Sequence, residues 1–361
     1  MSESPEKLGE HLGGIQRILV IRPDRLGDVL LSTPVFEAIR HHYPKAYLSI
    51  FVRAEIAVLL KGSPRVDEVI VFDPNSRHKG LSGFFNLIRD FRSHRFDTAV
   101  VLQTTLTIAA AVFFARVPLR LGPLSKLHSY LFFNRGVRQR RSQVKMHESD
   151  YNLELLRGLG ISAKPGQFKT SVTVSSEVVQ RAKSWLQEQT GAQGAPAWIA
   201  VHPGMGGSAL NWPESHYVEL VRELACDPAL RVLMTFGPAE DDLLRRYQQA
   251  LVGVTGVVFY GGADSQGLDF LAGLLSAMKV VVAPSTGPLH LAVALGKFVV
   301  SFYPPIRVQS VKRWGPLAGV ALSPQVDCGQ ELKCLGGACP HYPCMDLIKV
   351  QDVVKKVRDH L

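Results

Sequence analysis

Short apolar runs alternate with longer amphipathic segments along the chain. In the first half, the runs that predict strands are Ile18–Arg22, Tyr47–Val52, Glu68–Phe72 and Thr98–Leu102. Apolar residues at helical spacing follow several of these runs, over Asp28–His42, Leu81–His94 and Leu106–Ala115. Strands that alternate with helices in this way form βαβ units, so the pattern predicts an α/β fold with a parallel sheet.

The alternation stops once and then begins again. Gly, Pro and Lys interrupt it over Ile161–Thr170, and a predicted helix at Glu177–Thr190 leads to a new strand at Trp198. Further predicted strands are Arg231–Phe236, Val257–Tyr260, Val280–Ala283 and Phe298–Phe302. Two such halves predict two doubly wound domains that face a central cleft. The chain ends in a predicted amphipathic helix, whose apolar residues are Val350, Val353, Val354, Val357 and Leu361.

Composition agrees with a folded chain of two domains. The 361 residues are 46% hydrophobic, and the mean hydropathy is +0.09, which favours a large core over general disorder. No run reaches the roughly 18 apolar residues of a membrane-spanning helix. The segment Met1–Gly14 lacks the apolar core of a signal peptide. We therefore expect a cytoplasmic protein.

The chain is strongly basic, with a formal net charge of +10 and a pI of about 9.4. This favours anionic partners such as sugar nucleotides or an anionic membrane face, and no nucleic-acid motif accompanies the charge. One basic run without an acid is formed by Arg135, Arg138, Arg140, Arg141 and Lys145. It suits an anionic acceptor or lipid, and an ordinary solvated loop explains it as well. Similarly, Phe84, Phe85, Leu87, Ile88 and Phe91 suit either lipid contact or core packing.

The segment Ile18–Pro34 predicts a buried strand, a turn, and a helix with Asp28 in its first turn. Ligands of open α/β sheets bind at the carboxyl ends of the strands, where this Asp is expected. A carboxylate held there can accept a proton from a substrate hydroxyl. It can also simply complement the helix dipole. The segment by itself leaves both roles open.

Two segments of the second half suit phosphate groups. The strand that begins at Trp198 runs into the Gly-rich loop Gly204–Ser208, and Gly-rich turns let backbone N–H groups approach phosphate oxygens. The strand Val280–Ala283 runs through the turn Ser285–Gly287 into a helix that carries His290. His290 lies about one helical turn beyond Thr286, so a ligand role and a structural role both fit.

The five cysteines are not expected to form disulfides in a reducing compartment. Four of them gather near the C-terminus: Cys328, Cys334, Cys339 and Cys344. Four thiols suit a structural zinc or iron site, although the close Cys-x-x-Cys pair of common zinc motifs is absent.

Taken together, three segments resemble glycosyltransferase family 9, the heptosyltransferases of lipopolysaccharide core synthesis. Arg22–Pro34 is similar to the first βα unit of that family, His202–Pro213 to the start of its donor domain, and Ser285–Gly296 to its donor phosphate motif. The resemblance implies a GT-B fold with two Rossmann-like domains. It implies an N-terminal acceptor domain over residues 1–172 and a sugar-nucleotide domain over residues 173–345. It also implies that a last helix, residues 346–361, crosses back onto the first domain.

The resemblance further implies inverting transfer of heptose from ADP-heptose to a lipid-linked core acceptor, with no cofactor required. By their matching positions, Asp28 would be the general base and Gly27 would let the acceptor approach closely. Arg25 and the basic-run residues Arg138, Arg140 and Arg141 are our further candidates for acceptor binding. The donor would be bound by Gly206, Gly207, Ser208, Gly237, Asp241, Ser285, Thr286, Gly287 and His290. The protein would then work as a peripheral protein at the cytoplasmic face of the inner membrane. A cysteine segment ending like Cys344–Leu347 also occurs in the family.

Two positions depart from the family pattern. Ser285 replaces the Asp of the usual Asp-Thr-Gly turn, and Leu210 replaces a Lys that usually stands two residues before the Trp-Pro pair. Loss of a cation beside a diphosphate weakens binding unless other cations compensate, and Arg307, Lys312 and Arg313 are the candidates. A different nucleotide sugar, or a catalytically degenerate nucleotide-binding homologue, therefore remain alternatives.

Overall fold

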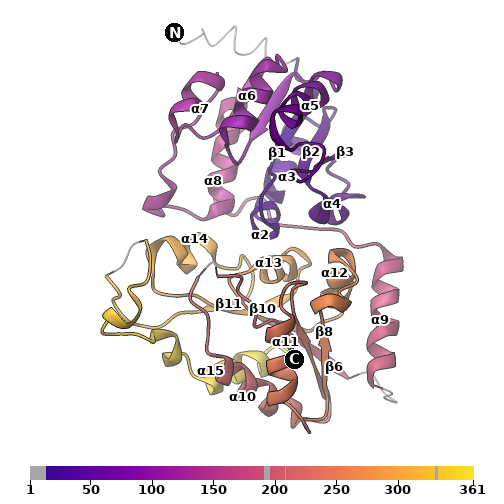
Figure 1. Ribbon diagram of the computed structural model, residues 1–361, viewed down its shortest axis with the longest axis vertical. Coiled ribbons are helices and arrows are strands. Elements are labelled where there is room, and N and C mark those ends of the chain that lie inside the picture. Colours follow the sequence, from indigo (N-terminus) through magenta and orange to yellow (C-terminus); the bar gives the residue numbers. More distant parts are fainter. Residues whose placement is uncertain (1–13, 191–195, 208, 330–331) are drawn as a thin grey trace. The chain divides into compact units, whose positions relative to one another are not determined.

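The computed structural model describes residues 14–190, 196–207, 209–329 and 332–361 and divides the chain into two compact units (Figure 1). Unit 1 comprises Met1–Ser142 and Glu148–Thr170, and unit 2 comprises Gln143–His147 and Ser171–Leu361. The first unit thus ends close to the expected boundary at residue 172. The short segment Gln143–His147, which we expected in the first domain, belongs instead to unit 2.

Unit 1 is built on a parallel sheet of five strands in the order β3-β2-β1-β4-β5. The strands are β1 (Arg17–Ile21), β2 (Tyr47–Arg53), β3 (Glu68–Phe72), β4 (Thr98–Val101) and β5 (Leu119–Leu121). Its helices are α2 (Leu26–Leu30), α3 (Thr33–His42), α4 (Ala54–Leu60), α5 (Gly80–Ser93), α6 (Leu106–Phe114), α7 (Leu127–Phe132) and α8 (Glu148–Glu154).

Unit 2 is built on a parallel sheet of six strands in the order β11-β10-β9-β6-β7-β8. The strands are β6 (Ala197–Val201), β7 (Leu230–Thr235), β8 (Val257–Tyr260), β9 (Val280–Pro284), β10 (Phe298–Phe302) and β11 (Val320–Leu322). Its helices are α9 (Ser176–Thr190), α10 (Glu214–Ala225), α11 (Asp241–Ala250), α12 (Leu268–Ser276), α13 (Gly287–Ala294), α14 (Val311–Trp314) and α15 (Val350–Arg358). The predicted α/β fold with two Rossmann-like sheets is confirmed.

Both sheets reverse their strand order next to their first strand. In unit 1, β2 and β3 extend the sheet on one side of β1, while β4 and β5 extend it on the other. In unit 2 the same change occurs between β6 and β9. Open α/β sheets bind ligands at such switch points, beyond the carboxyl ends of the strands. The segments that follow β1, β6 and β9 are therefore the first places to search for a site.

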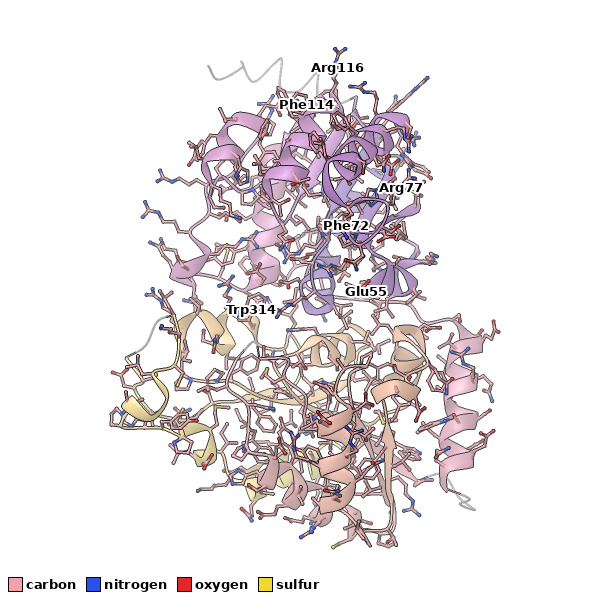
Figure 2. The ribbon with its side chains drawn as sticks, in the orientation of Figure 1. Glu55, Phe72, Arg77, Phe114, Arg116 and Trp314 are labelled. Carbon is pink, nitrogen blue, oxygen red and sulfur yellow. The ribbon has the colours of Figure 1, made fainter. Side chains whose placement is uncertain are left out.

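Each unit has its own apolar core, and side chains fill the space between its sheet and helices (Figure 2). In unit 1, Leu19 and Ile21 of β1 pack with Phe91 of α5 and Val112 of α6. In unit 2, Trp212 stacks on Phe302, with ring centroids 4.5 Å apart. In the described part of the chain, no helix is long and apolar enough to cross a membrane.

The helix expected over Asp28–His42 is broken into α2 and α3. Pro34 lies in the first turn of α3 and has no N–H to donate to the Leu30 carbonyl one turn earlier. The Thr33 hydroxyl donates to that carbonyl instead, at 2.8 Å, and the Ser32 hydroxyl donates to the Asp28 carbonyl at 2.7 Å. Asp28 therefore lies on a helix of five residues, not on a long one.

The C-terminal helix packs into the core of unit 2, whereas we expected residues 346–361 to pack on the first domain. The valines of α15 at 350, 353, 354 and 357 are buried in the core of unit 2, where α15 packs against α10 and β10. The Trp212 indole N–H donates to the Ile348 carbonyl at 2.9 Å and anchors the segment that precedes α15. One apolar stripe on a short helix is satisfied by its own unit.

Candidate functional site

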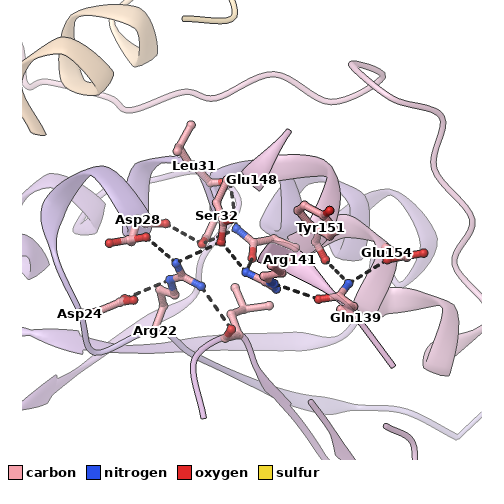
Figure 3. Close-up of polar contacts among 12 residues, drawn as sticks. Arg22, Asp24, Asp28, Leu31, Ser32, Gln139, Arg141, Glu148, Tyr151 and Glu154 are labelled. Atoms are coloured by element: carbon pink, nitrogen blue, oxygen red, sulfur yellow. Dashed lines mark hydrogen bonds and ion pairs between the residues drawn. The ribbon is translucent and has the colours of Figure 1, made fainter. Parts of the chain in front are cut away.

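Asp28 lies just beyond the carboxyl end of β1, at the switch point of the unit 1 sheet. Its carboxylate accepts a hydrogen bond from Arg22 Nη2 at 2.8 Å (Figure 3). The Asp28 side chain keeps 22% of its surface exposed, while that of Arg22 keeps only 3%. Asp28 is thus held in place from the protein side and remains accessible from the other.

Arg22 is the centre of this arrangement, and the sequence analysis had given it no role. Its Nε lies 3.0 Å from Asp24 Oδ1, and its Nη1 donates to the Leu102 carbonyl at the end of β4 at 3.2 Å. Its Nη2 also lies 3.9 Å from Glu148 Oε1. One planar guanidinium therefore binds groups from four segments and fixes the position of Asp28 among them.

A second arginine completes what we call the carboxylate network: Arg22, Asp24, Asp28, Arg141 and Glu148. Arg141 forms an ion pair with Glu148, which is almost fully buried on α8. Figure 3 shows the chain of contacts from Asp28 through Arg22 to Glu148 and Arg141. Buried ion pairs of this kind persist only when their polar atoms are well satisfied.

Further amides hold the same region. Asn152, fully buried on α8, donates to the Ser32 hydroxyl at 3.2 Å, and so attaches α8 to the break between α2 and α3. The Gln139 carbonyl oxygen accepts from Arg141 Nε at 3.0 Å, while its amide donates to Glu154 at 2.9 Å. The segment that carries the basic run is therefore tied to the helix break beside Asp28.

Burial sets the pKa values of the two aspartates. Desolvation raises the pKa of Asp24 to about 6, although the neighbouring Arg22 cation opposes the shift. Desolvation also raises the pKa of Asp28, where Arg22 again lowers it and the negative charge of Glu148 raises it. A carboxylate with a raised pKa is a better proton acceptor than an ordinary surface Asp.

The helix-dipole role of Asp28 has little support. Helix α2 has only five residues, and its N-cap, Arg25, makes no side-chain cap hydrogen bond. A helix this short sums few peptide dipoles, so it offers a carboxylate little stabilisation. The strongest partner of Asp28 is a guanidinium rather than a helix terminus.

The candidate acceptor residues fall into two groups. Arg25, Arg138 and Arg140 are exposed, and the charge of Arg25 lowers the pKa of Asp28. Gly27 is half-buried in α2. Arg141 is instead engaged with Glu148, Gln139 and Asn152, so its guanidinium already serves the carboxylate network. Sequence could not separate Arg141 from the other arginines of the run.

In unit 2, the Gly-rich loop follows β6 at the switch point of that sheet. Gly206 and Gly207 have φ angles of +54° and +71°, which favour glycine, and a Cβ built on either one would meet nothing within 4 Å. The loop therefore leaves open space above its backbone. The Asn211 amide donates to the Pro203 carbonyl at 2.6 Å and fixes the base of the loop. Ser208 lies outside the described residues.

A carboxylate that we had not predicted supports this loop. Glu240 accepts from the Gly237 N–H at 2.6 Å, and a Cβ at Gly204 would lie 2.3 Å from the Glu240 carboxylate. Glu240 therefore lies at the carboxyl ends of β6 and β7. Asp241, our original candidate for this region, instead accepts from the Ala263 N–H at 2.9 Å.

The turn Ser285–Gly287, here called the donor turn, joins β9 to α13. Thr286 is the N-cap of α13 and its hydroxyl donates to the Pro284 carbonyl at 3.2 Å. His290 is buried on this helix, and burial lowers the pKa of His290 to about 3, with His147 contributing in the same direction. His290 is therefore neutral at physiological pH and adds no positive charge to the turn.

Cationic side chains lie instead on the segment that follows β10, the strand next to β9. A cavity of about 450 Å³ beyond β10 is lined by Pro304, Pro305, Arg307, Ser310, Val311, Lys312, Ser323, Asp327 and Gly329. Pro284 and Phe302 are register partners at the carboxyl ends of β9 and β10, so this segment begins beside the donor turn. Arg313 lies over the ring of Trp314, 4.7 Å from its centroid. Leu210, at the position where a Lys was expected, packs against the apolar core of unit 2.

The four clustered cysteines are free thiols. Burial raises the pKa of Cys344, and the three other cysteines add to the shift. Cys344 is also a member of the unit 2 core. Among the described residues, which leave out 330 and 331 in this loop, no group of three or more His, Cys, Asp and Glu side chains is arranged to hold a metal ion. The structural metal predicted here therefore finds no support.

A family model decides the family. The model of glycosyltransferase family 9 (heptosyltransferase) matches residues 84–337, well over half of the chain. The chain belongs to glycosyltransferase family 9. It is therefore a glycosyltransferase, and the resemblance found in the three sequence segments is confirmed.

Relatives of this family 9 chain share most of its length. A protein named putative glycosyltransferase, from Haemophilus influenzae, is 30% identical over 314 residues, which cover 85% of this chain and 87% of that protein. Lipopolysaccharide heptosyltransferase 2 of Escherichia coli is 26% identical over 291 residues, covering 80% and 83% of the two chains. The solved structure of E. coli ADP-heptose lps heptosyltransferase II superposes with a TM-score of 0.76 at 22% identity, covering 95% of this chain and 98% of that one. This likeness shows that the chain has the fold of the family.

Proposed function

We propose that this family 9 glycosyltransferase moves heptose from ADP-heptose to a lipid-linked lipopolysaccharide core acceptor, with inversion at the sugar. The observation that carries the proposal is Asp28, a largely buried but still accessible carboxylate of raised pKa, fixed by Arg22 at a sheet switch point. The curated relative from E. coli is named for heptosyl transfer to lipopolysaccharide, which supports the substrate class.

In the proposed reaction, Asp28 accepts the proton of the acceptor hydroxyl. The hydroxyl oxygen forms a bond to the anomeric carbon, and the bond from that carbon to the diphosphate oxygen breaks. The electron pair of the broken bond stays on ADP. Arg22 is a positioning residue, because it holds the Asp28 carboxylate in one orientation and touches no reacting atom. General-base catalysis of this kind contributes roughly 10²–10⁴-fold.

Unit 2 is the proposed donor unit. Backbone N–H groups of the Gly206–Gly207 loop and of the donor turn are suited to the diphosphate. Arg307 and Lys312 of the adjacent cavity are the cations that would offset its charge in place of the Lys replaced by Leu210. Gly237 and Glu240 are proposed for the ribose hydroxyls, since Glu240 combines a carboxylate with a place at the ends of β6 and β7.

Unit 1 is the proposed acceptor unit. Arg25, Arg138 and Arg140 are exposed cations that suit the anionic sugars and phosphates of a lipid-linked oligosaccharide. An acceptor with a lipid anchor also implies that the enzyme works at a membrane surface, as a peripheral protein at the cytoplasmic face of the inner membrane.

A calorimetric and kinetic comparison of donors tests the proposal. Purified protein is titrated with ADP-heptose and with ADP, UDP and GDP sugars, and each is then assayed for transfer to a deacylated core oligosaccharide. Selective binding and transfer of ADP-heptose is the expected result. Transfer from another nucleotide sugar alone would contradict the donor assignment and leave the role of Asp28 intact.

A second candidate keeps the fold and the base but uses a different nucleotide sugar. Ser285 and Leu210 favour it, because both replace charged residues of the family's donor site. The same donor panel separates the two candidates. A degenerate homologue predicts nucleotide binding without transfer from any donor, and no change when Asp28 is replaced.

A further inference from the structure

Three helices of unit 1 leave large apolar side chains uncovered. Leu81 and Phe85 on α5, Leu106 on α6, and Leu127 and Leu131 on α7 are all more than half exposed. We call the following set the apolar face: Leu81, Phe85, Leu106, Phe113, Phe114, Leu127, Tyr130 and Leu131. Single exposed apolar residues are ordinary, but several on adjacent helices mark an interaction surface.

The apolar face is continuous across the three helices. Helix α6 packs against α5 on one side and α7 on the other. The Phe84 ring lies 5.8 Å from that of Phe85 and 6.3 Å from that of Phe114. The Phe113 ring lies 5.4 Å from that of Phe132 on α7. Rings in contact therefore join α5 to α7 through the end of α6.

Helix α6 shows most clearly that this face is left uncovered by the described part of the chain. Its sequence from Leu106 to Phe114 contains no charged residue. Ile108, Ala109, Ala111 and Val112 pack into the core of unit 1, while Phe113 and Phe114 are exposed. Figure 2 labels Phe114. The core of unit 1 covers one face of α6, and α5 and α7 pack beside it, while Leu106, Phe113 and Phe114 stay exposed among the described residues. A strongly apolar helix with such exposed side chains is typical of an interaction surface.

The charge around this face has one sign. Residues 98–147 contain no Asp or Glu, and their basic residues are Arg116, Arg120, Lys126, Arg135, Arg138, Arg140, Arg141 and Lys145. Arg89 and Arg92 on α5 are also exposed, and Asp90 between them is paired with Arg77 and His78. Arg116 lies two residues after Phe114, just past the Ala115 C-cap of α6, and both residues are labelled in Figure 2. An apolar centre with a basic surround is complementary to an anionic lipid surface.

We propose that the apolar face docks on an anionic phospholipid bilayer. Leu81, Phe85, Leu127 and Leu131 enter the boundary between headgroups and acyl chains, and Arg89, Arg116 and Lys126 contact lipid phosphates. A second copy of the chain fits less well, since a self-contact would bring like charges together. The need for a membrane partner rests on the proposed function, whose acceptor carries lipid, but the docking is measured without any transfer.

Vesicle co-sedimentation of the full-length protein tests the docking. Vesicles of phosphatidylcholine alone are compared with vesicles that also contain phosphatidylglycerol, each at low and high salt. The variant Phe85→Ser/Leu127→Ser/Leu131→Ser should lose roughly tenfold or more of its partition onto anionic vesicles, because three exposed apolar groups no longer leave water. Arg89→Gln/Arg116→Gln should reduce the salt-sensitive part of the binding.

Val252→Ser is the matched control, because Val252 is an apolar residue of unit 2 that is 79% exposed and is not part of the apolar face. It should bind vesicles like the wild type. Unfolding temperature and nucleotide binding show that each variant is folded. Unchanged vesicle binding of the triple variant would overturn the proposal, and so would a wild type that binds no anionic vesicle. A wild-type dimer that the triple variant abolishes, with no vesicle binding, would assign the face to a second copy instead.

The outcome is separable from that of the proposed function. Transfer to a deacylated, water-soluble acceptor should be the same in the triple variant and in the wild type. If the wild type binds anionic vesicles through this face yet transfers no sugar, the docking stands and the proposed function fails. If the wild type transfers heptose but does not bind anionic vesicles, the proposed function stands and the docking proposal fails.

Discussion

The two sheet switch points use opposite kinds of chemistry. Beyond β1 of unit 1, side-chain charges dominate: Asp28 lies among buried groups of both signs and takes its position from Arg22. Beyond β6 and β9 of unit 2, the segments carry glycines, Ser285, Thr286 and a neutral His290. The same fold element thus presents a fixed carboxylate in one unit and mostly backbone groups in the other.

The difference follows from what each edge is proposed to do. A base needs one side chain in one orientation with a tuned pKa, which a crowded charge network supplies. A diphosphate needs several N–H donors and room for close approach, which glycines at positive φ supply. The predictions below break or sharpen this contrast, and they begin with the largest expected effect.

Replacing the proposed base should show the largest difference between the two units: transfer should be lost, while nucleotide-sugar binding by unit 2 should be kept. Asp28→Asn should lower transfer by roughly 10²–10⁴-fold, since no carboxylate remains to take the proton. Nucleotide-sugar binding, measured by calorimetry, should stay unchanged because unit 2 is untouched. Glu55→Gln is the control, as Glu55 is an exposed acid of unit 1 (labelled in Figure 2) that forms only a 3.9 Å ion pair with Arg53. Full activity of the Asp28→Asn enzyme would exclude Asp28 as the general base.

Two neighbours of Asp28 should move its titration in opposite directions. Transfer is lost as pH falls through the pKa of Asp28, since the protonated acid accepts no proton. Arg22 lowers that pKa and Glu148 raises it. The acid limb of kcat/KM should therefore shift to higher pH in Arg22→Met and to lower pH in Glu148→Gln. If the acid limb moved in the same direction in both variants, the electrostatic roles assigned to Arg22 and Glu148 would be contradicted.

Arg22→Met also leaves buried carboxylates without their cation. We expect it to cost about 3–5 kcal/mol in the free energy of unfolding. Arg22→Lys keeps the charge and loses the planar fork, so it should be more stable than Arg22→Met but still reduce kcat more than it changes KM. Thermal unfolding beside the kinetics distinguishes lost positioning from lost folding.

In unit 2, the cations of the cavity beyond β10 should affect donor binding alone. Arg307→Gln and Lys312→Gln should each weaken nucleotide-sugar affinity roughly tenfold, and the loss should shrink at high salt. Arg313→Gln is the matched control, because Arg313 is next to Lys312 on α14 but its guanidinium lies over Trp314. Equal losses in all three variants, measured by calorimetry, would indicate a general charge effect rather than a donor site.

The smallest effect is expected at His290. With a pKa of about 3, its imidazole stays neutral between pH 5 and pH 8, so donor affinity should not change over that range on its account. His290→Gln keeps a neutral polar side chain and should alter the dissociation constant less than threefold, a change of under roughly 1 kcal/mol. A donor affinity that weakens above pH 6 in the wild type and not in the variant would show an imidazolium in the site.

Much of the fold was accessible from sequence because buried parallel strands are apolar throughout. Predicted Phe298–Phe302 coincides with β10, and predicted Val280–Ala283 lies within the fully buried β9. Asp28 was found from its place after β1. The edge strands β5 and β11, three residues each, were missed because runs this short carry too little pattern. Helix α15 was expected on the first domain and packs into unit 2 instead, because a stripe of valines does not say which core it joins.

The carboxylate network could not be predicted from the sequence, for a different reason. Arg22 and Glu148 are far apart in sequence, and neither periodicity nor motif spacing brings them together. Arg141 looked like any other arginine of the basic run until its ion pair with Glu148 was visible. Glu240 was missed in favour of its neighbour Asp241, because one residue of register decides which carboxylate faces the ends of the strands.

The charges of the carboxylate network balance only after a proton has arrived. Three carboxylates, of Asp24, Asp28 and Glu148, share the two guanidiniums of Arg22 and Arg141, with the exposed Arg25 outside this set. With all five groups ionised, the sum is one negative charge, held where desolvation already disfavours it. Uptake of one proton brings the sum to zero. In the proposed reaction, the excess charge is present before transfer, and its relief would favour the step in which the acceptor hydroxyl gives up its proton to Asp28.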